Sequence, residues 1–298
     1  MASLRDVKNQ INAVKKTKQI TRAMNMVASA KLRGAQSKIE RFRPYAEKFY
    51  EMLTELAAGT DPSIHPLLET REEVNTVGIV VATSERGLCG SFNTNLAQMA
   101  RKLADNKIAE GKQVKMICVG KKGRDFFRKR GYDIMSDHTG AMNDFDFTLA
   151  NQIGMEVIGA YLRGELDEVH MVFSEFVSMA KQVATSLPLL PLAGAAETAA
   201  ETEAEQPGAG GMSEYIYEPS VEGLLAELLP RYVKVVIYRG LLDTSTSEHA
   251  ARMAAMDNAT KNCDEMVDTL TLQYNKARQA VITTELMDIV GGAEALKG

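Results

Sequence analysis

Two glycine-rich turns are the places where this chain could hold a phosphate with backbone amides. They are Gly87-Leu88-Cys89-Gly90 and Gly120-Lys121-Lys122-Gly123, and each follows a short apolar run. A helix that begins at such a turn can bind a nucleotide phosphate through its first N–H groups. The chain nevertheless has no GxGxxG, Walker, GxSxG or HExxH motif. The sequence therefore favours tight turns over a nucleotide site and predicts no catalytic residue.

Histidine and cysteine are the other residue types that could do chemistry. The four histidines are at 65, 138, 170 and 249, and the three cysteines are at 89, 118 and 263. None of them shares a metal-ligand spacing with another, so we expect no metal site and no cofactor. Three widely separated cysteines are typical of buried thiols in a reducing compartment.

The segment between about 74 and 192 predicts the α/β sheet that would carry both turns. Continuous apolar runs are typical of parallel strands covered on both faces. Such runs lie at 76–82, 114–119 and 169–173, and an edge strand is expected at 183–192. Helical patterns separate them at 96–103, 123–130 and 147–162. This alternation predicts right-handed βαβ units in an open, Rossmann-like sheet.

A long helix is predicted at the C-terminal end. From Leu241 to Val290 no Gly or Pro interrupts the chain. One apolar stripe at helical spacing consists of Met256, Ala259, Cys263, Met266 and Leu270. The stripe resumes one residue later at Tyr274, Ala277 and Val281. We interpret the slip as a stutter in a coiled coil.

The N-terminal end carries a second helical pattern. Its stripe begins with Leu4, Val7, Ile11 and Val14, resumes after a shift of phase with Ile20, Met24 and Val27, and returns between Ile39 and Leu56. If the two ends pair, the segment between them is an inserted domain. The expected parts are an N-terminal coiled-coil helix at 1–60, the α/β domain at 74–192, a flexible acidic linker at 193–213, and a foot segment with the C-terminal coiled-coil helix at 214–298.

Charge is distributed unevenly, although the net charge is only −4. Residues 1–48 hold twelve Lys and Arg against three acidic residues, a local net charge of +9, whereas the segment between Lys181 and Arg231 has eight Glu and no basic residue. The first forty residues lack interleaved aromatic residues, and the basic segment has no recognisable nucleic-acid-binding module. Nucleic acid is therefore the weaker alternative and is not expected as a partner, and an acidic protein surface is as good a partner. No apolar run reaches eighteen residues, and we expect no transmembrane span.

One segment near the C-terminus is highly specific. Ile282-Thr283-Thr284-Glu285-Leu286-Met287-Asp288-Ile289-Val290-Gly291-Gly292-Ala293-Glu294-Ala295 closely resembles the C-terminal signature of the gamma subunit family of F-type ATP synthases. Further stretches are similar to the same family, and they lie at 20–31, 84–93, 215–219 and 274–280. The resemblance covers nearly the whole chain.

The resemblance implies a fold and a function. The fold is α/β plus a long antiparallel coiled coil, in which the N- and C-terminal helices pair and the open α/β domain is inserted between them. The function is that of a non-catalytic central-stalk rotor, which couples proton flow through the membrane ring to conformational change and ATP synthesis or hydrolysis at beta-subunit catalytic sites. The implied partners are the alpha and beta subunits of the catalytic hexamer, the epsilon subunit and the membrane ring of c subunits. The implied location is peripheral, on the cytoplasmic face of the bacterial inner membrane.

The resemblance also implies two contact regions. Residues expected to contact the alpha/beta ring are Met24, Arg278, Gln279, Thr283 and Glu285. Residues expected to contact the membrane ring and the epsilon subunit are Tyr215, Tyr217 and Glu218. In an extended segment both Tyr rings of the second group would share one face, with the carboxylate on the other.

Two other functions stay open at this point. An enzyme that used the α/β domain would need a phosphate loop and converging polar groups. A coiled-coil scaffold unrelated to energy conversion would need neither, but it would give no reason for the segment 282–295.

Overall fold

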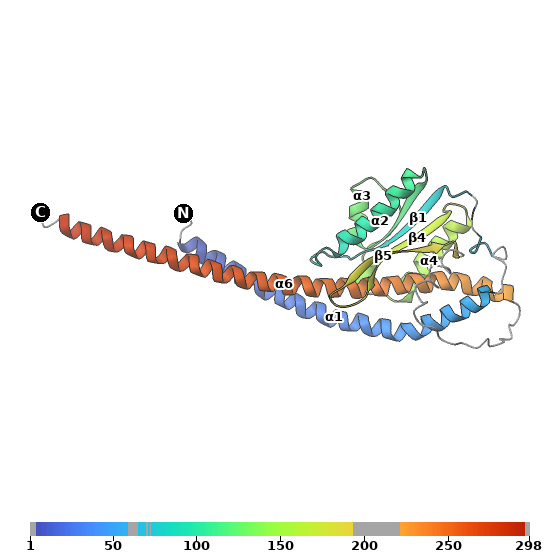
Figure 1. Cartoon of the computed structure of the whole chain (residues 1–298), viewed down its shortest axis with the longest axis horizontal. Helices are drawn as coiled ribbons and strands as arrows, with labels where there is room; N and C mark the ends of the chain where they lie inside the picture. The colour runs from blue at the N-terminus through green and yellow to red at the C-terminus, as the bar shows by residue number, and fades with distance from the viewer. Residues whose placement is uncertain (1–3, 59–64, 70, 72, 193–220, 296–298) are drawn as a thin grey trace. The chain divides into compact units, whose positions relative to one another are not determined.

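The computed structural model describes residues 4–58, 65–69, 71, 73–192 and 221–295, and these form two compact units. Unit 1 combines residues up to 30 with residues from 252 onward, and unit 2 spans 31–251. Two long helices, α1 (Leu4–Ala58) and α6 (Val221–Ala295), contribute residues to both units (Figure 1). The predicted linker at 193–213 lies outside the described residues.

Unit 2 is built on a five-stranded mixed sheet in the order β3-β2-β1-β4-β5. The strands are β1 (Thr76–Ala82), β2 (Gln113–Val119), β3 (Asp133–His138), β4 (Glu168–Phe176) and β5 (Gln182–Leu190). The first four are parallel, and β5 pairs antiparallel with β4. The open sheet predicted from the apolar runs is confirmed. Strand β3 was not predicted, because Asp133-Ile134-Met135-Ser136-Asp137-His138 is mostly polar and only half-buried.

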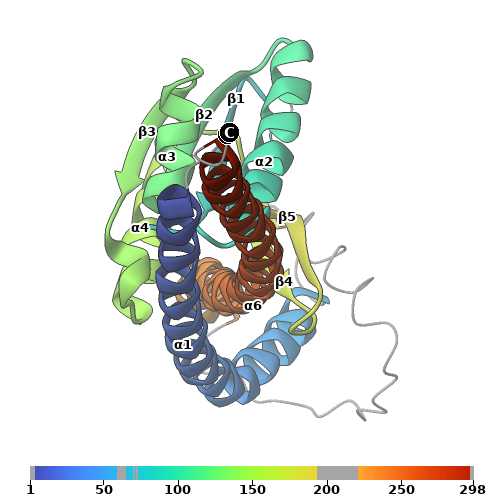
Figure 2. The same cartoon turned by 90° about the vertical axis from the view of Figure 1, so that its left-hand side faces the viewer.

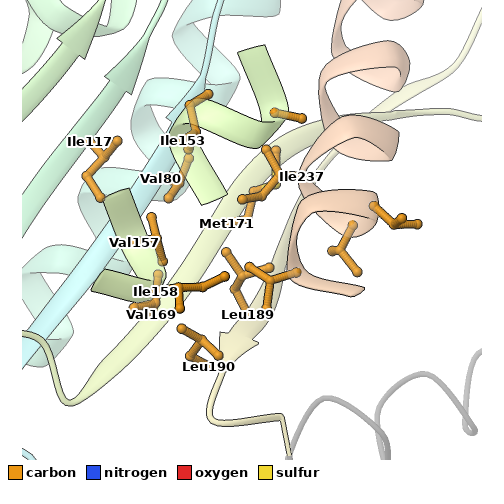
Figure 3. Close-up of a cluster of buried hydrophobic side chains, with 14 of the residues drawn as sticks. Val80, Ile117, Ile153, Val157, Ile158, Val169, Met171, Leu189, Leu190 and Ile237 are labelled. Atoms are coloured by element: carbon orange, nitrogen blue, oxygen red, sulfur yellow. The ribbon is translucent and has the colours of Figure 1, made fainter. Parts of the chain in front are cut away.

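Helices cover both faces of this sheet. They are α2 (Phe92–Ala109), α3 (Lys121–Arg128) and α4 (Phe147–Leu162), and a short 3-10 helix, η2, spans Ala141–Asn143. Leu96 of α2 and Phe127 of α3 pack in the core on one face. On the other face, side chains of β1, β2 and β4 meet those of α4 and α6 (Figure 3). Each fully buried Leu, Ile or Phe there stabilises the unit by roughly 1.5–3 kcal/mol.

Helix α6 begins twenty residues before the stretch that the sequence predicted as helical. Pro230 and Gly240, which suggest helix breaks, both lie inside it. A Cβ atom at Gly240 would come within 2.6 Å of Cε of Met171, so the glycine allows α6 to approach β4 closely. Gly154 plays the same part where α4 meets α6, since a Cβ there would lie 2.6 Å from Cγ of Lys234. Packing against the sheet therefore overrides the local breaker signals.

Unit 1 is an antiparallel helix pair made from the start of α1 and the end of α6 (Figure 2). The direction follows from three cross-helix contacts in which the α1 number rises while the α6 number falls. They join Lys18 to Asp264, Thr21 to Thr260 and Asn25 to the main-chain oxygen of Met253. The predicted pairing of the terminal helices is thus confirmed for this unit.

The predicted stripes of unit 1 need correction. Ile20, Val27 and Met266 are 60%, 58% and 53% exposed, so none of them lies in the seam between the helices. On α1 the seam continues from Val14 through Lys18, Thr21, Asn25 and Ala28, and on α6 it runs through Met256, Thr260, Cys263, Val267, Leu270, Tyr274 and Ala277. Both series alternate steps of three and four without a break. The shift of phase and the stutter were wrong, because the pattern was traced through apolar residues while part of the seam is polar.

Candidate partner-binding surface

The end of β1, beside which the glycine-rich turns could bind a nucleotide, is filled by the chain's own polar groups. Thr83, directly after β1, is fully buried. Its hydroxyl accepts a hydrogen bond of 2.8 Å from the amide of Gly123, in the first turn of α3. The same hydroxyl lies 3.2 Å from the carbonyl oxygen of Val119, to which it donates. These bonds hold the second glycine-rich turn tightly against the end of β1.

Glu85 occupies the position that an anionic ligand would take beside α3. Its carboxylate accepts hydrogen bonds from the amides of Lys121 at 3.2 Å, Gly140 at 2.8 Å and Met142 at 3.4 Å. Carboxylates and phosphates are favoured at a helix N-terminus for the same electrostatic reason. An internal carboxylate thus takes the place of a phosphate, which supports the tight-turn interpretation.

The neighbouring crevice, between β1 and β4, is filled by α6. The parallel register of Val81 with Val172 brings the end of β4 beside the end of β1. There the amide of Ser174 donates to the hydroxyl of Thr244 at 3.2 Å, and the hydroxyl of Ser247 donates to the carbonyl of Ser174 at 3.2 Å. Crevices at such switch points hold ligands in many open α/β sheets. Here buried helix side chains occupy the space.

One cysteine and two histidines of unit 2 have structural surroundings that account for them. Burial raises the pKa of the Cys118 thiol to about 12, which keeps it protonated and unreactive. His138 lies 3.1 Å from a carboxylate oxygen of Glu156, and His170 lies 2.6 Å from one of Glu168. Within the part of the chain that the structure describes, no three His, Cys, Asp or Glu side chains form a group that could hold a metal ion.

The end of α6 extends beyond its partner helix. Continuing the register of Lys18 with Asp264 places Leu4, the first described residue of α1, opposite about residue 278. The seventeen residues from 279 to 295 therefore have no α1 residue opposite them among those described. They would span roughly 25 Å along the helix. Unit 1 thus ends in a single helix.

An apolar stripe runs along this single-helix end. Its members recur at helical spacing and are all exposed: Ile282 at 47%, Leu286 at 56%, Ile289 at 67% and Val290 at 56%. Thr284 and Asp288 each follow a stripe residue by two positions, about 200° round the helix, so they lie on the opposite face. A contiguous apolar surface of this kind marks a site for another protein.

The contact residues expected near this end are at the surface. Arg278 and Gln279 are exposed and precede Ile282 by four and three residues, so they continue the face that carries the stripe. Thr283 is exposed and donates a hydrogen bond of 2.9 Å to the carbonyl of Gln279, and Glu285 is exposed as well. The geometry brings these four residues together on one helix end.

The remaining expected contacts are elsewhere. Met24 lies on α1 in unit 1, is half-buried and precedes the seam residue Asn25. Tyr215, Tyr217 and Glu218 lie outside the described residues. The apolar stripe itself was missed by the residue-by-residue reasoning, although its helical spacing was visible in the printed sequence.

Comparison with known proteins decides the family. A family model described as ATP synthase matches residues 3–296. The ATP synthase gamma chain of Nitratidesulfovibrio vulgaris (Miyazaki F) is 66% identical over 298 residues, which is 100% of both chains. The chain belongs to the ATP synthase gamma-chain family. The gamma chain of Maridesulfovibrio salexigens, at 65% identity over 100% of both chains, is a second bacterial member.

Two solved structures agree with the fold. A chain of the central stalk and c-ring of Tetrahymena thermophila mitochondrial ATP synthase is 26% identical, with a TM-score of 0.59 over 80% of this chain and 99% of that chain. A chain of the rotor of Euglena gracilis mitochondrial ATP synthase is 21% identical, with a TM-score of 0.62 over 94% of this chain and 98% of that chain. The fold class of terminal helices around a mixed α/β sheet is confirmed.

Among the described residues, no helix combines the length and apolar character that crossing a bilayer requires.

Proposed function

We propose that this chain is the rotating central stalk of an F-type ATP synthase. In this role it couples proton flow through the membrane ring to conformational change, and thereby to ATP synthesis or hydrolysis, at beta-subunit catalytic sites. The proposal is supported by the match to bacterial gamma chains over the full length. It is also supported by a structural relative of 26% identity that comes from a central stalk with its c-ring.

The observation that carries the proposal is the end of α6. An amphipathic helix that stands alone in water leaves its apolar stripe exposed, which is unfavourable unless another protein covers it. The stripe begins at Ile282, and Arg278 and Gln279 sit on the same face. We assign this face to the alpha and beta subunits of the catalytic hexamer, together with Met24 on α1.

The proposed role is mechanical, and the chain itself is not an enzyme. The places where an open α/β sheet binds a nucleotide are filled here by Glu85 and by the hydroxyls of Thr83 and Thr244. A gamma chain that only transmits force needs no catalytic group. A measurement of nucleotide binding by the isolated chain tests this point, and tight binding would favour the enzyme.

The other end of the stalk is assigned to the membrane side. We propose that Tyr215, Tyr217 and Glu218 contact the polar loops of the c-ring and the epsilon subunit. The chain would then be a peripheral subunit on the cytoplasmic face of the bacterial inner membrane.

The decisive experiment changes Arg278 and Gln279 together to Ala. We expect the complex to assemble and the vesicles to synthesise ATP more slowly, because the helix end loses a charged and an amide group that face its partners. Synthesis and ATP-driven proton pumping would be measured in inverted membrane vesicles. The matched control is the double change of Thr284 and Asp288 to Ala, which removes one charge and one polar group from the opposite face.

Two results would contradict the assignment. Unchanged synthesis in the Arg278 and Gln279 variant would show that this face makes no functional contact. An equal loss in both variants would show that the helix end acts without regard to face, so the apolar stripe would not define the contact.

A further inference from the structure

The helix pair of unit 1 buries polar residues of α1 and exposes apolar ones. Thr21 and Ala28 are 8% and 2% exposed, whereas their neighbours Ile20 and Val27 are 60% and 58% exposed. Apolar burial alone favours the reverse arrangement, in which the larger apolar side chains enter the seam. Something other than hydrophobicity therefore sets which face of α1 meets α6.

The first polar layer is a pair of threonines. The hydroxyl oxygens of Thr21 and Thr260 are 2.8 Å apart. Each also lies near a carbonyl of its own helix, Thr21 at 3.0 Å from that of Lys18 and Thr260 at 2.7 Å from that of Met256. Since each hydroxyl has one proton, one threonine donates across the pair while the other donates within its helix. The hydrogen bond between the two hydroxyls forms only when the threonines face each other.

Two further polar layers lie on either side. The amide nitrogen of Asn25 donates a hydrogen bond of 2.9 Å to the carbonyl of Met253 on the opposite helix. Lys18 forms an ion pair with Asp264, and the two side chains are 35% and 52% exposed. A single buried Asn at a seam position is known to fix how coiled-coil helices pair, because any other arrangement leaves its amide unpaired.

The alternative arrangement differs by a rotation of α1 about its own axis. Turning α1 by one residue, about 100°, would exchange Thr21, Asn25 and Ala28 for Ile20, Met24 and Val27 in the seam. More apolar surface would be buried. All three cross-helix contacts would be lost, however, and the hydroxyl of Thr260 would face apolar side chains.

We propose that the three polar layers fix the rotation of α1 about its own axis and thereby keep Ile20 and Val27 on the outside of the pair. The apolar layers of Leu4 to Val14 with Val267 to Ala277 supply stability. The polar layers supply orientation. This role does not depend on the proposed function.

The test uses cysteine accessibility in the full-length chain with Cys263 changed to Ala. Two reporters are made separately, Val27→Cys on the exposed face and Ala28→Cys in the seam. In the parent we expect maleimide to label position 27 at least about tenfold faster than position 28, in keeping with their exposure. The seam variant then changes Thr21, Asn25 and Thr260 to Ala, and the labelling ratio should invert, because the turn of α1 would take position 27 into the seam and position 28 out of it.

A control variant removes as many polar groups from exposed positions, by changing Thr17, Gln19 and Asn262 to Ala. Its labelling ratio should match the parent. Circular dichroism at 222 nm reports whether the helices persist, and Asn25→Ala alone should lower the ratio without loss of helix.

Two outcomes overturn the proposal. An unchanged ratio in the seam variant would show that Thr21, Asn25 and Thr260 do not set the rotation. Fast labelling at both positions, in the seam variant and in Asn25→Ala, would show that the polar layers hold the helices together and do not orient them.

Discussion

Replacing Asp243 with Asn should stabilise unit 2 at neutral pH. Asp243 lies on α6, between the buried residues Leu242 and Thr244. Burial raises the pKa of its carboxyl group to about 6, with Arg239 and Arg43 opposing the shift and Glu175 adding to it. Burial therefore favours the neutral acid, and the ionised carboxylate destabilises the folded state. Asn has nearly the same shape as the neutral acid and carries no charge.

The size and sign follow from proton linkage. A carboxyl whose folded-state pKa is raised from 3.8 to about 6 favours folding below pH 3.8 and loses that contribution as the pH rises through 6. One unit of pKa corresponds to about 1.4 kcal/mol, so the full penalty is about 3 kcal/mol at pH 8 and roughly half of that at pH 5. Asp243→Asn removes this penalty. The gain in stability should therefore grow with pH.

Urea unfolding followed by tyrosine fluorescence between pH 5 and pH 8 measures this gain. The chain has no Trp, and Tyr161 and Tyr238 report on the core of unit 2. Glu227→Gln, at an exposed site on the same helix, is the matched control and should give a small difference that does not change with pH. A gain that stays constant with pH, or a loss of stability at pH 8, would refute the reasoning.

Three further predictions concern the sheet and the foot. Glu168→Gln should destabilise unit 2 at pH 7 by up to about 3 kcal/mol and have little effect near pH 2, as measured by urea unfolding. The reason is that a hydrogen bond from His170, together with the ion pair to Lys107, lowers the pKa of Glu168 from 4.5 to about 2. Gly120→Ala should cost more than about 2 kcal/mol in the same assay, since its φ is +96° and the new Cβ would overlap the carbonyl of Thr83; Gly111→Ala, with a φ of +84° and open space, should cost about 1 kcal/mol. A cysteine at Glu218 should crosslink to a cysteine in a c-ring loop or in the epsilon subunit, and crosslinks confined to this chain would contradict the foot assignment.

The predictable elements of unit 2 are those whose apolar residues are buried within the same unit. Strand β1 matches the predicted run at 76–82, and α4 matches the predicted helix at 147–162, because each is covered by its own unit. Strand β3 is at the edge of the sheet and mostly polar, so periodicity gives no signal for it. The first turns of α6 contain Pro230, and only packing against the sheet makes that stretch helical.

Unit 1 shows a different limit. Hydrophobicity selected Ile20 and Met266 for the seam, whereas the structure places Thr21 and Val267 there. A stripe traced through apolar residues cannot show hydrogen bonds between two helices, and here those bonds determine which residues are buried. The signal for the observed seam is the pair of polar residues at seam spacing on each helix, such as Thr21 and Asn25 on α1.

The end of α6 beyond α1 shows a further limit of sequence patterns. A sequence pattern records that a stripe will be covered, but it does not record whether the cover comes from the same chain. The stripe of Met256 and Cys263 is covered by α1, and the stripe of Ile282 and Leu286, on the same helix and at similar spacing, is covered by nothing in this chain's described residues. The register fixed by the three cross-helix contacts separates the two, because it shows where the first described residue of α1 lies. We therefore propose as partner surface the stripe at this helix end that the described part of the chain leaves exposed.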